Sequence, residues 1–415
     1  MQLQKPGFLP TLLRLTAALS LATLSGLAAA QAVPIASTPT TLVSTADRMI
    51  SYRMQNHMWQ TPDGATHVMI NRGPGMGGNS LALFSTFDGG TNWVNSGVSL
   101  PQSNGSSTSD GYFADGRLYT TYDVGTGTIR FAELVYDSPS KTWSLGPTST
   151  VYTSAVAGAL TPAVAVDAAG RQWLAFTHQD KATGNFSIKM MRKAVADQAW
   201  TDTGFVFGPV DNLANERSGR PIATARGMGL VFTVKTETYW AERNDRWALE
   251  QPWPRALIST KVTPTNDPYG THFSIVADSA FNMHMFSGDG GQVVYSRYLV
   301  FEKKWSTRTL TEAIKATYMQ ATMSGNQLML VTNSYANLSV YQSADGGNTF
   351  TRTHALTHPA ATEGIDYSRP RVETPAYSTS PVPVLQQFMD GKLQRAMFFA
   401  VPVGSSVPVA ADTSR

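Results

Sequence analysis

The chain has 415 residues, with 32 lysines and arginines against 29 aspartates and glutamates, and it has no cysteine. A chain without cysteine forms no disulfide and has no thiolate chemistry, so its stability must come from a large packed core. The nearly balanced charge argues against a general nucleic-acid binder and against a binder of anionic membranes, since both carry a basic excess.

The first 30 residues have the pattern of a secretory signal peptide. Lys5 and Arg14 precede the apolar run "LTAALSLATLSGLAAA", which ends in small residues. Removing this segment leaves 30 basic against 29 acidic residues. We expect a flexible leader over 31–41, a folded domain over 42–403 and a disordered tail over 404–415. No other stretch reaches the roughly 18 apolar residues of a membrane span. We therefore expect a secreted or periplasmic monomer without a membrane span.

Short runs with alternating apolar residues recur along the chain beside turn residues, as β-strands do. Seven of these runs begin near residues 66, 117, 171, 229, 281, 327 and 382. A period of about 50 residues is typical of a propeller, in which each repeat is one four-stranded blade. The sequence therefore predicts an all-β fold, a single β-propeller with seven four-stranded blades, or six if one repeat is over-divided.

Most repeats follow one plan. An apolar inner strand, such as "PAVAVD", "PIATA", "HFSIVAD" or "QATMS", leads through a turn into the second strand, and a Trp or Phe opens the outer strand. The last repeat, 369–403, has room for only three strands. We expect the segment "TTLVSTADRMI", at the start of the mature chain, to supply the fourth strand and close the ring.

Two stretches share a motif. "TFDGGTNW" (86–93) and "SADGGNTF" (343–350) both have a hydroxyl residue, an Asp, two glycines and a final aromatic residue. The glycines permit positive φ in a hairpin turn, and the carboxylates of Asp88 and Asp345 can accept backbone N–H bonds there. We expect both to be structural turns between third and fourth strands. "SGDGGQVV" (287–294) lacks the aromatic residue and is interpreted as a turn that only looks similar.

This motif resembles the Asp box, or bacterial neuraminidase repeat, of the sialidase-like propeller superfamily. Sialidases of that superfamily hold a sialic acid carboxylate with three arginines, the first in a Phe/Tyr-Arg-Ile-Pro motif before the first Asp box. This chain has "YRMQ" (52–55) in that place. They also use an Asp as general acid and a Tyr activated by a Glu. The resemblance implies these roles for Asp110, for Tyr367 or Tyr377, and for Glu216.

The spacing of three arginines also predicts a site for an acidic group. Arg53, Arg220 and Arg369 stand at the starts of inner strands, and 167 and 149 residues separate them, about three blades each. All three can therefore point into one channel, the usual ligand site of a propeller. Because guanidinium groups bind carboxylates bidentately, this set suits the carboxylate of an acidic sugar.

A second set suits a different reaction. His57, Tyr269 and His272 could supply the acid and base that remove the proton α to a uronate carboxylate, as in a polysaccharide lyase, while Arg220 or a histidine neutralises that carboxylate. His178 and His284 fall inside second strands, where we expect packed residues. No cluster has metal-ligand spacing, so we expect no metal and no cofactor.

Three functions remain open on the sequence. The first is an exported, sialidase-like glycoside hydrolase acting on an acidic sugar or glycan. The alternatives are a non-catalytic propeller that binds glycan or protein, and a lyase on uronate-containing polymers. The expected partner in the first and third cases is a carbohydrate.

Overall fold

The computed structural model describes residues 32–404, except 35–36, 51, 77, 102–107, 125–126, 155–159, 198, 212–218, 235–236, 250, 261–271, 290, 314–315, 317, 335–336 and 358–364. For a few strand residues, 367–370 among them, it describes the backbone alone. The predicted signal peptide and nearly all of the predicted tail lie outside the described residues. Within the described part, no helix is long and apolar enough to cross a membrane.

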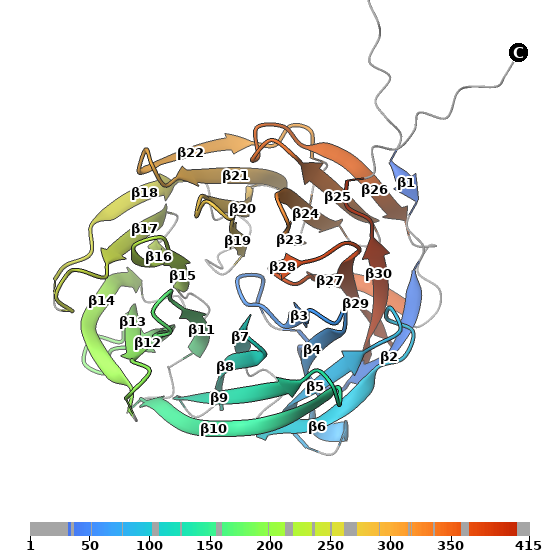
Figure 1. Ribbon diagram of the computed structural model, residues 1–415, viewed down its shortest axis with the longest axis horizontal. Helices are drawn as coiled ribbons and strands as arrows, with labels where there is room; N and C mark the ends of the chain where they lie inside the picture. Colours follow the sequence, from blue (N-terminus) through green and yellow to red (C-terminus); the bar gives the residue numbers. More distant parts are fainter. Residues whose placement is uncertain are drawn as a thin grey trace, which may run out of the picture. The chain divides into compact units, whose positions relative to one another are not determined.

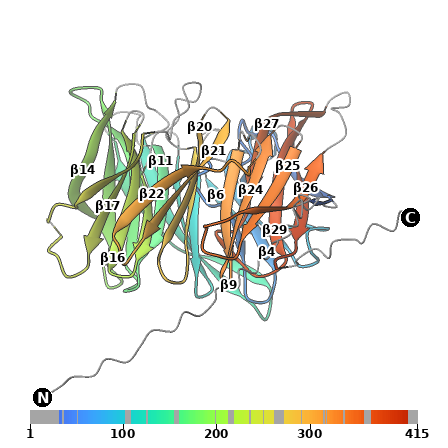
Figure 2. The ribbon, with the colours of Figure 1, turned by 90° about the horizontal axis from the view of Figure 1, so that it is seen from above.

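The described chain forms seven sheets that stand as blades around a central channel (Figures 1 and 2). Strands are given from the channel to the rim. Blade 1 has β3 (Met58–Gln60), β4 (Thr66–Asn71), β5 (Ser80–Thr86) and β6 (Val94–Pro101). Blade 2 has β7 (Ser109–Ala114), β8 (Arg117–Asp123), β9 (Thr128–Asp137) and β10 (Thr142–Thr153). Blade 3 has β11 (Leu160–Val166), β12 (Gln172–Gln179), β13 (Phe186–Lys193) and β14 (Thr201–Asp211).

The other four blades follow the same order. Blade 4 has β15 (Arg220–Thr224), β16 (Gly227–Val234), β17 (Glu237–Asn244) and β18 (Arg255–Ser259). Blade 5 has β19 (Phe273–Ala277), β20 (Met283–Asp289), β21 (Gln292–Leu299) and β22 (Lys304–Thr309). Blade 6 has β23 (Tyr318–Ser324), β24 (Gln327–Ser334), β25 (Asn337–Ser343) and β26 (Thr351–Thr357). Blade 7 has β27 (Ile365–Glu373), β29 (Val382–Asp390), β30 (Leu393–Val401) and β2 (Thr38–Ser44).

The prediction of seven four-stranded blades is confirmed, and so is the closure of the ring by the N-terminal strand. Strand β2 pairs antiparallel with β30, with Thr38 opposite Phe398 and Ser44 opposite Gln394. A short strand before it, β1 (Val33–Pro34), pairs parallel with β26. Both strands begin before residue 42, so part of the segment expected to be a leader belongs to the sheets.

Two additions distinguish the ring from seven equal blades. A short 3-10 helix, η1 (Pro74–Met76), lies between β4 and β5. Strand β28 (Tyr377–Ser378) pairs parallel with the inner strand β23 of blade 6. This strand belongs to the connection from β27 to β29, which therefore runs across to the neighbouring blade at the channel.

Apolar side chains fill the space between blades because both faces of most sheets are covered. All six residues of β4 are buried, and so are all seven of β23. One cluster joins Met69 and Leu83 of blade 1 to Leu118 and Leu134 of blade 2. The predicted aromatic residue of the outer strand contributes to such clusters: the Trp93 ring lies 5.9 Å from that of Phe398, centroid to centroid.

The turns that carry the shared motif are built alike. In the first turn, the Thr86 hydroxyl donates to Asp88 and accepts the N–H of Gly90. In the second, the Ser343 hydroxyl donates to Asp345 and accepts the N–H of Gly347. Both turns connect third to fourth strands, and "SGDGGQVV" falls instead around the turn from β20 to β21, the second and third strands of blade 5.

The carboxylate of Asp345 accepts the backbone N–H and the hydroxyl of Thr349, at 3.0 and 2.6 Å. Burial would raise its pKa, but these hydrogen bonds outweigh it and hold the pKa at about 2. The carboxylate is therefore ionised and engaged within its own turn.

Candidate functional site

Residues 52–57, which lead into β3, cross the central channel and form a plug. In Figure 1 this segment is the blue loop inside the ring. The backbone carbonyl of Arg53 accepts the side-chain amide of Gln320 in blade 6, at 3.0 Å. The amide of Gln55, which is fully buried, donates to the carbonyl of Pro162 in blade 3, at 2.8 Å. The stretch predicted to resemble the first sialidase arginine motif therefore lies in the channel as a loop.

Asp110 joins this plug to three blades. Its Oδ1 accepts the backbone N–H of Asn56 and the Arg220 guanidinium, both at 2.6 Å, and its Oδ2 accepts the backbone N–H of Val164 at 2.7 Å. The Asp110 and Arg220 side chains are both almost fully buried. Three donors from the plug and two further blades therefore engage both oxygens of this carboxylate.

His57 joins the plug to blade 7. Its backbone N–H donates to Glu373 Oε1 at 3.0 Å, and its Nδ1 lies 3.1 Å from Glu373 Oε2. Both side chains are buried. The other ring nitrogen, Nε2, is buried without a hydrogen-bond partner among the described residues.

An arginine cluster lies where the plug meets blades 6 and 7. The guanidinium carbons of Arg53 and Arg371 lie 4.5 and 6.0 Å from the centre of the Tyr318 ring, within cation–π range. Arg48 contacts Tyr52 in the same way, at 4.7 Å. Burial lowers the pKa of Arg371, and the nearby charge of Arg48 adds to this effect. A concentrated positive charge of this kind suits an anionic group.

On the other side of the plug, the channel opens into a basin with two lobes. This is the end of the propeller at which first strands turn into second strands. The lobes measure about 150 and 100 Å³ and share Asn56, Tyr112, Ala376 and Tyr377 in their walls. Arg220 and Asp278 line the larger lobe, whereas Trp59 and Gln60 line the smaller one. The basin is smaller than the roughly 300 Å³ at which pockets for drug-sized ligands begin.

Tyr377 reaches the basin on the strap of chain that contains β28. Gln60 Oε1 accepts the backbone N–H of Thr379 at 2.7 Å, and the carbonyl of Ala376 accepts the N–H of Met323 at 2.9 Å. These two bonds hold the strap to blades 1 and 6. About half of Tyr377 is exposed, at 53%, but its hydroxyl end accepts from the N–H of Ala277.

The protonation states of the basin follow from these contacts. Burial raises the pKa of Tyr377 to about 12 and also raises the pKa of Tyr112. Asp278 is different: burial raises its pKa, but hydrogen bonds from His284 and Asn282 outweigh this and bring it to about 2. At neutral pH the basin therefore holds two neutral phenols and an ionised carboxylate.

Trp59 forms the wall of the smaller lobe because Gly111 leaves room for it. A Cβ at Gly111 would come within 2.4 Å of the Trp59 ring. The indole N–H of Trp59 is buried and has no hydrogen-bond partner among the described residues. The ring is thus fixed by packing, and its polar edge is unused by the described chain.

Of the predicted site residues, the structure brings together Asp110 and Arg220 in one ion pair. Arg53 and His57 lie on the plug, with Arg53 stacked on Tyr318 and His57 against Glu373. His272 is half-buried directly before β19. Among the histidines expected to be packed, His284 is buried, and His178 is half-buried in β12.

The remaining predicted site residues are not described well enough to test. Glu216 and Tyr269 lie outside the described residues, and for Tyr367 and Arg369 only the backbone in β27 is described. The convergence of three arginines on one carboxylate therefore stays a prediction. No group of three or more His, Asp or Glu side chains able to hold a metal occurs among the described residues.

Sequence reasoning missed Arg371, although a signal was present. In "SRPRVE", Arg371 follows the predicted site residue Arg369 by two positions, the spacing at which residues of a regular strand are expected to share a face. Tyr318 and Trp59 could not be identified in this way, because each lies in an apolar stretch that is typical of the hydrophobic core.

Comparison with known proteins agrees with the fold. No protein-family model and no curated protein matches the sequence. A PL25 polysaccharide lyase, an ulvan lyase bound to a GlcA-Rha3S saccharide, is 10% identical and aligns with a TM-score of 0.50 over 87% of this chain and 96% of its own. An α-L-arabinanase of Penicillium chrysogenum with arabinobiose is 10% identical, with a TM-score of 0.47 over 88% and 98%.

A lectin, SapL1, in complex with α-methyl fucoside is 12% identical, with a TM-score of 0.49 over 75% of this chain and 99% of its own. At 10% identity, the likeness to the ulvan lyase shows the propeller fold alone and not a shared site. Because no family model matches, the resemblance to the Asp-box sialidases rests on the motif residues alone.

Proposed function

We propose that this protein is an exported carbohydrate-binding propeller that takes one sugar unit into the basin at the end of its channel. The observation that carries the proposal is the lining of the basin, where Tyr112, Tyr377 and Trp59 surround a small cavity beside Arg220 and Asp278. Aromatic rings present a negative face to the C–H bonds of a sugar ring. Guanidinium and carboxylate groups hydrogen-bond its hydroxyls.

Binding is favoured over hydrolysis by the state of the carboxyl groups. Most glycosidases need a carboxylic acid that is protonated near neutral pH beside a second carboxylate, and sialidases pair such an acid with a tyrosine. Asp278 is ionised with a pKa of about 2, and Asp110 is surrounded by three donors. Neither is arranged as a proton donor to a ligand in the basin.

A second candidate function is favoured by the arginine cluster at Tyr318. Arg53 and Arg371 there provide the positive charge that the processing of an acidic sugar requires, whether by a sialidase-like hydrolase or by a lyase. In either case Glu216, Tyr269 or Tyr367 would have to supply the acid and base chemistry. This reaction would occur on the opposite side of the plug from the basin.

Titration of the full chain against glycans that a glycan array identifies tests the first proposal. Wild-type protein should bind saturably, and Tyr377→Ala should weaken binding by tenfold or more, since aromatic anchors carry most of the affinity of a small site. Phe87→Ala is the matched control, because Phe87 is a 40% exposed aromatic residue in the β5–β6 turn, outside the basin. Equal binding by both variants would refute the basin as the site.

Activity assays separate the two candidates. Release of a fluorophore from an acidic glycoside would support hydrolysis, and rising ultraviolet absorbance on a uronate polymer would support a lyase. In both cases Arg371→Met should abolish the signal and Tyr377→Ala should preserve it. Saturable binding without either signal supports the binding protein alone.

A further inference from the structure

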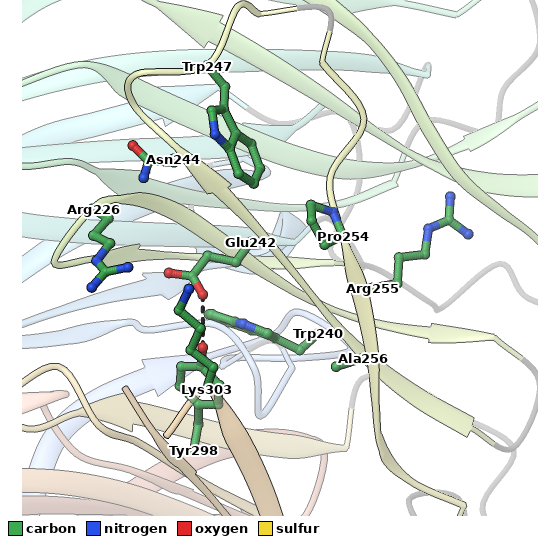
Figure 3. A pocket seen from close by; sticks show the side chains of 10 residues that line it. All are labelled: Arg226, Trp240, Glu242, Asn244, Trp247, Pro254, Arg255, Ala256, Tyr298 and Lys303. Atoms are coloured by element: carbon green, nitrogen blue, oxygen red, sulfur yellow. Dashed lines mark hydrogen bonds between the residues drawn. The ribbon is translucent and has the colours of Figure 1, made fainter. Parts of the chain in front are cut away.

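A second cavity lies at the rim, between blades 4 and 5. Its volume is about 230 Å³, larger than either lobe of the basin. Figure 3 shows Trp247, Arg226, Glu242 and Pro254 around one space, with Tyr298 of blade 5 beside Glu242. None of these residues lines the basin, so the cavity is a separate site.

One side of the cavity comes from a connection in blade 4 that differs from the motif turns of blades 1 and 6. In those blades the connection from third to fourth strand is a compact turn, residues 87–93 and 344–350. In blade 4 the same connection, residues 245–254, is longer and carries Trp247. Trp247 and Pro254 of this connection form a wall of the cavity beside the neighbouring blade.

This wall is held in place by hydrogen bonds. The buried Arg243 donates to the carbonyl of Trp247 at 2.6 Å, and the N–H of Trp247 donates to the carbonyl of Asn244 at 3.0 Å. The side chain of Asn244 accepts the N–H of Arg246 at 3.0 Å. Trp247 itself is half-buried. Its position is therefore fixed before a ligand arrives, which lowers the entropy cost of binding.

The floor is an aromatic cluster with one carboxylate. The Trp240 ring lies 5.6 Å from Tyr298 and 5.7 Å from Trp305, centroid to centroid. The Tyr298 hydroxyl donates to Glu242 Oε2 at 3.0 Å. Burial and the neighbouring Glu242 carboxylate raise the pKa of Tyr298, so its proton stays in this bond. Glu242 is thereby oriented, and its other oxygen, Oε1, accepts no hydrogen bond from the described residues, so it can accept one from a ligand hydroxyl.

Charges at the cavity favour an anionic ligand. Arg226 and Lys303 both line it, against the single carboxylate of Glu242. Arg255 points away in Figure 3, and its guanidinium lies over the rings of Phe207 and Phe232. Without Arg255, the two positive charges of Arg226 and Lys303 exceed the negative charge of Glu242 by one.

From these observations we infer that the cavity between blades 4 and 5 is a second saccharide site, which binds one sugar unit against Trp247 and prefers an acidic unit such as a uronate. Glu242 accepts ring hydroxyls, and Arg226 and Lys303 face the carboxylate. The inference shares its ligand class with the proposed function but none of its residues. Two sites on one ring would let the protein hold a polymeric glycan at two places, which raises its overall affinity for the polymer.

Saturation-transfer NMR with methyl β-glucuronide and methyl β-glucoside tests this site, and the Tyr377→Ala background removes the contribution of the basin. The glucuronide should bind saturably and more tightly than the glucoside. Trp247→Ala should weaken it by tenfold or more, and Arg226→Met should remove the preference for the acid. Phe301→Ala is the matched control, because Phe301 is 90% exposed in the β21–β22 turn and does not line the cavity.

Three results would overturn the inference. They are the absence of saturable binding of either glycoside in the Tyr377→Ala background, equal binding by the Trp247→Ala and Phe301→Ala variants, and tighter binding of the glucoside. Because Arg226 is exposed in a turn, its variant should fold even where Trp247→Ala does not. Loss of the basin signal in Tyr377→Ala with the rim signal intact would support both sites separately.

Discussion

Replacement of Asp110 by Asn separates a structural role in the channel from a catalytic one. The substitution keeps the shape of the side chain but removes its charge and one of its two acceptor oxygens. Arg220, which is 5% exposed, would then be a buried cation without its partner, and the N–H of Asn56 or Val164 would lose its acceptor.

The size of the effect follows from this loss. Removing one partner of a buried ion pair costs about 3 to 5 kcal/mol, because the other charge remains desolvated. For a chain of 415 residues, with an unfolding entropy of about 2.1 cal/mol/K per residue, this corresponds to a fall in Tm of about 3 to 6 °C. The free-energy loss and the fall in Tm both apply to unfolding in a single cooperative transition.

Urea unfolding followed by tryptophan fluorescence measures the loss. The matched control is Asp202→Asn, since Asp202 pairs with Lys189 at 2.6 Å but is 41% exposed at its side chain. That variant should lose less than about 1 kcal/mol. Adding Arg220→Met to Asp110→Asn should recover part of the stability, with a coupling energy of about 2 kcal/mol in a double-mutant cycle.

The opposite pattern would refute this reasoning. If Asp110→Asn unfolded like the wild type and abolished turnover of an acidic glycoside, Asp110 would be the general acid that the sialidase resemblance implies. Its hydrogen bonds to Arg220 and the plug would then be incidental to stability.

Two further predictions concern stability away from the channel. Gly347→Ala should destabilise the protein more than Gly346→Ala, because an added Cβ lies 1.9 Å from the Tyr295 hydroxyl at Gly347 and meets nothing within 4 Å at Gly346. Since both residues have positive φ, Gly346→Ala should lower the stability by only about 1 to 2 kcal/mol, through backbone strain. Unchanged Tm values for both variants would contradict this prediction. Burial lowers the pKa of His67 from 6.5 to about 4. Between pH 4 and pH 6.5, therefore, His67 is mostly protonated in the unfolded chain and mostly neutral in the folded chain. Stability should be complete above pH 6.5 and fall by about 3 kcal/mol as the pH drops toward 4; an equal pH dependence in His67→Asn would show that another group is responsible.

The architecture was predictable from the sequence because it rests on repetition. A run near residue 66 and its six successors mark the second strand of every blade, and the short last repeat required a strand from elsewhere. The β5–β6 and β25–β26 turns were predictable for a similar reason, since Asp88 and Asp345 make bonds with residues only a few positions away.

The site was predictable only in part, because its contacts join distant residues. The sequence predicts Arg53 at the start of an inner strand, but the path of residues 52–57 across the channel depends on Gln320, Pro162 and Glu373, more than 100 residues away. The pairing of Asp110 with Arg220 likewise spans blades 2 and 4. Periodicity indicates which residues stand at the channel and does not indicate which of them neutralise one another.

The most direct measurement is calorimetric titration of the full chain with a glycan that it recognises, for the wild type, Tyr377→Ala and Phe87→Ala. We predict saturable binding by the wild type and Phe87→Ala and an affinity at least tenfold weaker in Tyr377→Ala. The glycan should be recovered uncleaved in all three cases. Equal affinity in all three proteins, or cleavage of the glycan that survives Tyr377→Ala, would contradict it.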